Sequence, residues 1–165
     1  MHEKFMRRAL EIARQSLEIP GALPYAAVIV KDGQIVGEGL NKSFANHDPT
    51  SHGEVEAVRD ACARLGTTRL DGCDLYTTAE PCSMCVATMY LAGIANLYYA
   101  SAAAESAAFL GRLAASDDKY RRHRSNDDLR HQVGLPLVER QMPSKQVLAD
   151  EMLNLFDDYA NGVGS

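Results

Sequence analysis

The chain has 165 residues, 46% hydrophobic and 24% charged, with 12 Gly and 6 Pro, which is the composition of a globular domain and excludes collagen-like, coiled-coil and disordered proteins. Its net charge of -5 argues against a protein that mainly binds a phosphate backbone, so we expect a small-molecule substrate and no nucleic-acid partner. No apolar stretch reaches the roughly 18 residues of a membrane span, and the N-terminus lacks a secretory signal, so we expect no membrane partner and a cytoplasmic location.

The first part of the chain predicts a helix followed by a β-hairpin. Apolar residues recur at helical spacing before Pro20-Gly21, at Phe5, Ala9, Ile12, Ala13 and Leu17. Residues 25–30 and 34–39 then predict two antiparallel strands, because Asp32-Gly33 between them is typical of a tight hairpin turn. We expect a loop over residues 40–51.

The rest of the chain alternates between helical and strand-like patterns. We expect a helix from near His52 to Gly66, a strand over 73–78, a helix over 81–91 and a strand over 95–100. A further strand is expected around 137–141, and the last helix carries an apolar face at Leu148, Met152, Leu155, Phe156 and Tyr159. This order predicts one α/β domain over residues 1–165, with a mixed sheet covered by helices.

Two segments at helix starts carry the chemistry, His52-Gly53-Glu54 and Pro81-Cys82-Ser83-Met84-Cys85. Cys82 and Cys85 lie three apart, so their sulfurs point from one face of a helix whose N-terminal amides favour thiolates. With His52 they form a three-residue zinc ligand set that leaves a fourth position open for water, as in catalytic sites. Glu54 is placed to act as the base that such a water needs.

Each of these residues also has a simpler interpretation. A Cys-x-x-Cys pair alone is typical of redox pairs or half of a structural zinc site. Glu54 alone fits a capping box that starts at Ser51. Together, however, the two segments match the His-x-Glu and Pro-Cys-x-x-Cys signature of zinc deaminases. Of the other two cysteines, Cys62 is interpreted as a core residue and Cys73 as the residue that starts a strand.

On these motifs the sequence resembles the cytidine deaminase-like superfamily, in its nucleobase and tRNA deaminase branch. The resemblance also takes in Val28-Ile29-Val30-Lys31-Asp32-Gly33, Asn41 and His47-Asp48-Pro49-Thr50, and it weakens after Ala100. It implies a three-layer α/β/α domain with a central mixed five-stranded sheet, one zinc ion per chain, and a homodimer. It further implies zinc ligation by His52, Cys82 and Cys85, proton transfer by Glu54, and a hydrogen bond from Asn41 to the substrate ring.

Within this branch the chain is most similar to guanine deaminases, which implies hydrolysis of guanine to xanthine and ammonia. Reading a purine amino group requires a carboxylate, for which the candidates are Asp117, Asp118, Asp157 and Asp158. The resemblance also implies that a C-terminal segment, about 145–165, packs on a partner subunit. Residues from Asp157 onward, including Tyr159, would then close over the base. Gly53 is expected to donate its backbone amide to the ring.

Three alternatives stay open at this point. Guanine deaminases commonly have alanine at the position of Gly53, and in this respect the chain is similar to fungal cytosine deaminases. Cytosine or a related aminopyrimidine is therefore an alternative substrate. His47-Asp48-Pro49-Thr50 is similar to tRNA adenosine deaminases, although the C-terminus is acidic where theirs is basic. A noncatalytic zinc module would lack the proton-transferring Glu54. A basic cluster, interpreted first as a solvated face with phosphate binding as the alternative, comprises Lys119, Arg121, Arg122, Arg124 and Arg130.

Overall fold

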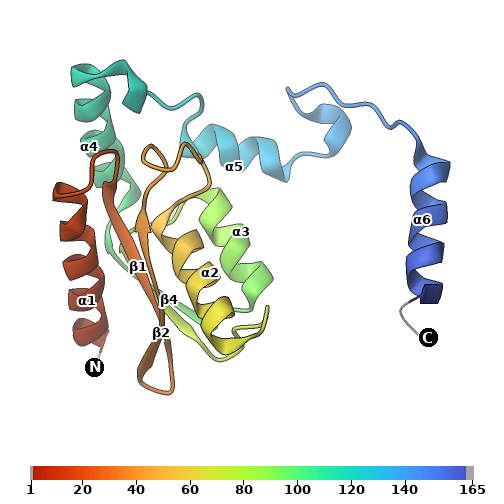
Figure 1. Cartoon of the computed structure of the whole chain (residues 1–165). Coiled ribbons are helices and arrows are strands. Elements are labelled where there is room, and N and C mark those ends of the chain that lie inside the picture. Colours follow the sequence, from red (N-terminus) through yellow and green to blue (C-terminus); the bar gives the residue numbers. More distant parts are fainter. Residues whose placement is uncertain (1, 163–165) are drawn as a thin grey trace. The chain divides into compact units, whose positions relative to one another are not determined.

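The computed structural model describes residues 2–162 and separates the chain into two compact units, Met1–Asn126 and Asp127–Ser165 (Figure 1). The first unit contains the sheet. Its strands are β1 (Leu23–Lys31), β2 (Gln34–Asn41), β3 (Asp74–Ala79) and β4 (Asn96–Ser101). Its helices are α1 (His2–Arg14), η1 (Gln15–Leu17), α2 (Gly53–Leu65), α3 (Ser83–Ala92), α4 (Ala103–Ser116) and η2 (Asp118–Tyr120).

The strands pair in the order β2-β1-β3-β4. β1 runs antiparallel to both β2 and β3, whereas β4 runs parallel to β3, so the sheet is mixed. The predicted hairpin is confirmed, with Asp32 at φ 50° and Gly33 at φ 75°. Positive φ at both central residues is what a turn that matches the strand twist requires.

Among residues 2–162 the sheet has four strands, so the expectation of a fifth strand is wrong. The strand expected around 137–141 is instead a helical turn, η3 (Leu137–Glu139). Its backbone bonds locally, with Glu139 N donating to Pro136 O and Gln141 N donating to the side chain of Gln132. These amides are therefore not available to a strand ladder.

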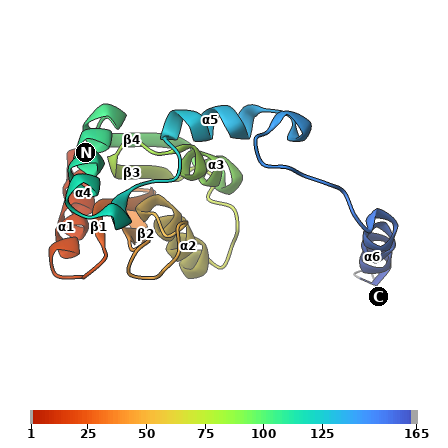
Figure 2. The same cartoon turned by 90° about the horizontal axis from the view of Figure 1, so that it is seen from above.

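Helices cover both faces of the sheet, as Figures 1 and 2 show. β1 alternates between two apolar clusters: Ala26, Val28 and Val30 pack with α1, while Ala27 and Ile29 pack with α2 and α3. A strand buried on both faces reads as a continuous apolar run because alternate side chains point to opposite sides. The three-layer α/β/α arrangement is confirmed in this unit, with α4 on the same side as α1.

The second unit contains most of α5 (Asn126–Gly134), then η3, and ends in α6 (Ala149–Gly162). The apolar face predicted for the last helix is present, and its large side chains are exposed, at Met152, Leu155, Phe156 and Tyr159. No helix in the described part of the chain is long and apolar enough to cross a membrane.

Candidate metal centre and active site

The three predicted metal ligands meet where two helices begin. His52 is the N-cap of α2, Cys82 is the N-cap of α3, and Cys85 lies in the first turn of α3. The His52 Nδ1 atom lies 3.6 Å from Cys82 Sγ and 3.4 Å from Cys85 Sγ, and the two sulfurs are 3.6 Å apart. A tetrahedron with zinc bonds of about 2.3 Å to sulfur and about 2.0 Å to nitrogen has edges of about 3.5–3.8 Å. The three donor atoms therefore fit one face of a zinc tetrahedron.

Close packing of α2 on the sheet brings the two helix starts together. A Cβ atom built on Gly39 of β2 would lie 2.1 Å from Gly53 O and 2.3 Å from Ala57 N. Only glycine allows so close an approach of a helix backbone to a strand. The N-terminus of α2 is thus packed directly against the sheet, beside the start of α3.

The surroundings of the two cysteines shift the pKa values of their thiols in opposite directions. Hydrogen bonding with Cys85, and with His52, lowers the pKa of Cys82 to about 3. Hydrogen bonding with Cys82 and burial raise the pKa of Cys85 above its usual range. A bound divalent cation would hold both sulfurs as thiolates, because metal-bound cysteines are deprotonated.

Glu54 lies beside the triad and is buried, with 5% of its surface exposed. Its Oε1 atom accepts a hydrogen bond from Thr77 Oγ1 at 3.2 Å, and its Oε2 atom accepts one from Cys85 Sγ at 3.4 Å. Burial raises the pKa of the carboxyl group, which suits a group that both takes and returns protons. Sequence reasoning missed Thr77, because no local pattern links β3 to α2.

The capping-box interpretation of Glu54 is not supported by these contacts. The N-cap of α2 is His52, and it makes no side-chain cap hydrogen bond. Ser51, which would start the box, instead accepts a hydrogen bond from Asn46 Nδ2 at 3.2 Å. The carboxylate of Glu54 points to the metal ligands and Thr77 rather than back to the helix start.

Asn41 and Gly53 lie close to the metal ligands and Glu54. Asn41 is buried, and its Oδ1 atom accepts hydrogen bonds from Ser43 N at 3.1 Å and Ser43 Oγ at 2.7 Å. Asn41 also lines the cavity, so its side-chain amide lies next to the space that a substrate would fill. A Cβ atom on Gly53 would lie 2.7 Å from Tyr25 O, which gives this glycine a packing reason independent of the substrate.

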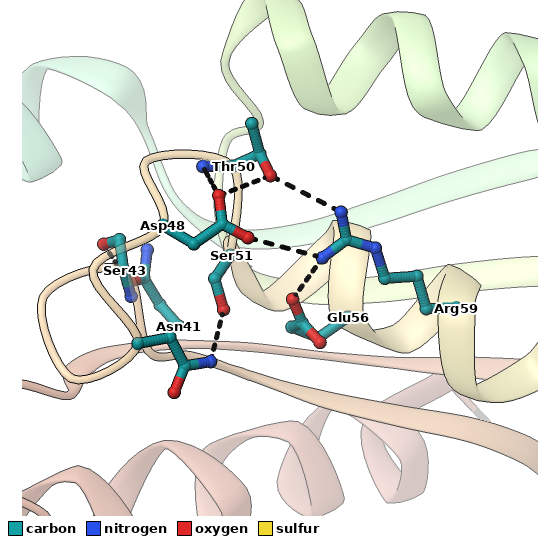
Figure 3. Close-up of polar contacts among 8 residues, drawn as sticks. Asn41, Ser43, Asp48, Thr50, Ser51, Glu56 and Arg59 are labelled. Carbon is teal, nitrogen blue, oxygen red and sulfur yellow. Dashed lines mark hydrogen bonds and ion pairs between the residues drawn. The ribbon is translucent and has the colours of Figure 1, made fainter.

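The loop between β2 and α2 is held by polar contacts of its own (Figure 3). Asp48 Oδ1 accepts hydrogen bonds from Thr50 N at 2.8 Å and Thr50 Oγ1 at 2.7 Å, which lower the pKa of this carboxyl. Arg59 of α2 pairs with Asp48 at 3.8 Å and with Glu56 at 2.7 Å. The loop is therefore tied to the helix that carries the histidine ligand.

A cavity of about 370 Å³ opens over the triad, within the size range of small-molecule sites. Its lining includes two of the metal ligands, His52 and Cys82, and the carboxylate of Glu54. One wall is the apolar side of α4, and another is the segment that connects α4 to α5. Lining residues that sequence reasoning had not assigned to a site include Tyr25, Glu80, Ser106, Leu110, Tyr120 and Asn126.

Residues 117–126, here called the strap, are fixed near both ends. The Tyr120 ring packs edge-on against Phe44 of the loop before α2, with ring centroids 5.0 Å apart. Asn126 Oδ1 accepts a hydrogen bond from the backbone amide of Ser83 at 3.1 Å, directly after the ligand Cys82. The strap therefore runs beside the cavity from the loop before α2 to the start of α3. The sequence did not predict that these distant segments meet.

The candidate acidic readers are not among the residues that line this cavity. Asp117 pairs with Lys119 at 2.7 Å, and Asp118 pairs with Arg121 at 2.6 Å. The other two acidic candidates, Asp157 and Asp158, lie exposed on α6 in the second unit, as does Tyr159. Their roles stay predictions.

Comparison with known proteins places these features in context. Residues 1–101 match the family model described as the cytidine and deoxycytidylate deaminase zinc-binding region. The guanine deaminase of Bacillus subtilis is 37% identical over 160 residues, covering 97% of this chain and 94% of that protein. Its X-ray structure is similar with a TM-score of 0.80, over 98% of this chain and 94% of that chain.

Other relatives match a smaller part. The tRNA-specific adenosine deaminase of Aquifex aeolicus is 39% identical over 99 residues, which cover 60% of this chain and 65% of that protein. A crystal structure in complex with 2,6-diaminopurine is 29% identical, with a TM-score of 0.63, over 67% of this chain and 61% of that chain. The similarity to guanine deaminase thus extends through the segments that the tRNA deaminase match leaves out.

Proposed function

The chain belongs to the zinc-binding cytidine and deoxycytidylate deaminase family, and from this membership we propose that it hydrolyses guanine to xanthine and ammonia. Membership makes it a hydrolytic nucleobase deaminase. The observation that carries the choice of guanine is the extent of the match, 97% of this chain against 60% for the tRNA-specific relative. A purine bound to a structural neighbour supports the same class of substrate.

The residues around the cavity divide the chemistry among them. His52, Cys82 and Cys85 would hold a zinc ion, which when bound would supply the Lewis acid needed to activate water at neutral pH. Glu54 takes a proton from the attacking water and passes protons to the ring nitrogen and to the departing ammonia. Its burial and its bond from Thr77 hold the carboxyl in one orientation for both transfers. The overall reaction replaces the amino group at C2 of guanine with oxygen.

Substrate orientation falls to Asn41 and to the start of α2. The Nδ2 atom of Asn41 donates to an acceptor on the ring, while its Oδ1 atom is kept in place by Ser43. The backbone amide of Gly53 points from a helix N-terminus, where it favours a ring oxygen or nitrogen. Both groups act without a charge of their own, as suits a neutral base.

Ammonia release from a panel of bases tests the proposed substrate. We expect guanine to be the best substrate of the zinc-loaded protein, ahead of cytosine, adenine, guanosine, cytidine and aminotriazines. A tRNA carrying adenosine at its wobble position belongs in the same panel, because the first 100 residues are similar to tRNA-specific deaminases. Faster turnover of cytosine or of the tRNA than of guanine would contradict guanine as the substrate and assign the faster one instead.

The protein is further proposed to act as a homodimer in which α6 reaches a neighbouring active site. This proposal rests on the exposed apolar face of α6, at Met152, Leu155, Phe156 and Tyr159, since exposed apolar patches commonly mark interfaces. The chain would then work as one deaminase domain per subunit. Its two thiolate ligands favour the reducing cytoplasm as its location.

Removing residues 160–165, of which 163–165 lie outside the described residues, and replacing Asp157 and Asp158 with Ala tests the role of this tail. We expect little change in melting temperature and a large fall in kcat/KM for guanine, because an open cavity admits water and loses contacts to the base. Replacing Asp150 and Glu151 at the other end of α6 is the matched control. Unchanged kinetics in the shortened chain would contradict the tail's role.

A further inference from the structure

The wall of the cavity that the strap forms is basic, which the sequence did not predict. The strap places three arginines on the lining, Arg121, Arg122 and Arg124, while no aspartate is among the lining residues in the described part of the chain. Two lining carboxylates are present, and both are engaged. Glu54 belongs to the metal centre, and Glu80 Oε2 accepts a hydrogen bond from Ala103 N at 2.9 Å. This wall therefore presents donors to whatever part of a substrate faces it.

Arg122 is the strap arginine that is available for a ligand. Arg121 Nε is paired with Asp118 at 2.6 Å, and Arg124 has an interaction partner within the protein. Within residues 2–162 no carboxylate pairs with Arg122. Its charge is nevertheless felt inside the cavity, where it opposes the burial that raises the pKa of the Tyr25 hydroxyl. Tyr25 also senses the charge of Glu54, so the three side chains share one electrostatic environment.

The reacting carbon fixes which edge of guanine faces away from the metal. C2 must lie at the metal ligands and Glu54, and in a purine the O6 and N7 atoms are on the side opposite C2. These two atoms are acceptors with the spacing that a guanidinium fork matches. An arginine donates through two parallel N–H groups and accepts nothing, so it favours this edge over the amino-bearing edge of adenine.

We propose that the guanidinium of Arg122 donates to O6 and N7 of the bound purine, which makes it a specificity-determining residue of this enzyme. The proposal rests on the proposed function and deepens it. Its structural basis is the strap, whose two anchors at Phe44 and Ser83 hold the arginine over the cavity. The basic cluster in the sequence thereby gains a role for one member that is distinct from binding phosphate.

Binding of two inert ligands to the zinc-loaded full-length protein tests this proposal. Hypoxanthine carries O6 and N7 but lacks the C2 amine, and 7-deazahypoxanthine differs from it only in having a C–H group at position 7. Calorimetry should show wild-type protein binding hypoxanthine more tightly by about 5- to 150-fold, the discrimination expected of a bidentate contact. Arg122→Ala should bind both ligands equally, and Arg122→Lys should retain only part of the preference, because lysine lacks the fork.

Matched measurements separate the possible outcomes. Arg112→Ala, on α4 and outside the lining, should behave as wild type. A preference for hypoxanthine that survives in Arg122→Ala, or an absence of preference in the wild type, overturns the proposal. Tighter binding of inosine monophosphate than of hypoxanthine, lost in Arg122→Ala, overturns it in favour of a phosphate subsite. If guanine is not deaminated but the Arg122-dependent preference is present, the proposed function fails and the recognition proposal stands.

Discussion

Replacing Glu54 with Gln should lower kcat for guanine by about 10²- to 10⁴-fold while zinc content and melting temperature stay at wild-type values. Glutamine has nearly the same shape, and its Oε1 atom can still accept the hydrogen bond that Thr77 donates. It cannot, however, take up and return a proton. The measurement is steady-state ammonia release, combined with metal analysis of the same preparation.

Glu56→Gln is the control for this variant. Glu56 lies two residues further along α2, and it pairs with Arg59 at the surface rather than facing the metal ligands. We expect its kinetics to match the wild type. Near-normal turnover by Glu54→Gln would show that Glu54 carries no protons, and it would return weight to the interpretation of Glu54 as a helix-capping residue.

Cys82→Ala should abolish both zinc binding and deamination. The variant removes one of three protein ligands, leaving His52 Nδ1 and Cys85 Sγ, which is too few for the tetrahedral set that the 3.4–3.6 Å spacings describe. Metal analysis should give one zinc per wild-type chain and less than about a tenth of that in the variant. Melting temperature should also fall, because a metal that binds only the folded chain stabilises it.

Cys62→Ala provides the matched control for the loss of a cysteine. Cys62 is partly buried on α2 and packs against the apolar core, away from the metal ligands. We expect it to retain zinc and activity with a modest loss of stability. Removing zinc from the wild type with a chelator, and restoring it, should reproduce and reverse the Cys82→Ala effect on activity. Full activity in a zinc-free wild-type preparation would contradict the assignment of the metal centre.

The arrangement of the metal centre explains why its prediction from the sequence was possible. Cys82 and Cys85 are three residues apart on one helix, and His52 precedes Glu54 by two residues at the start of another. Spacings of this kind are fixed by helix geometry and survive in any tertiary context. The hairpin and the helices over the first 101 residues were predictable for the same reason, because each follows from a local pattern.

Features that depend on contacts between distant segments could not be read in this way. Thr77 meets Glu54 across 23 positions, and Asn126 meets Ser83 across 43. Gly53, which the sequence associates with a pyrimidine substrate, is also required by packing, because Tyr25 O lies too close for a Cβ atom at this position. No periodicity encodes such pairings, since they arise only when the sheet and helices pack.

The sequence by itself therefore determined the candidate metal ligands, the candidate proton-transferring carboxylate and the order of elements over the first 101 residues, all of which rest on local patterns. Only the tertiary structure decided the number of strands, the walls of the cavity and the position of the strap. The expected strand near 137 became a helical turn because its amides found local acceptors. Arg122 became a candidate for reading the base because two long-range contacts hold its segment beside the cavity.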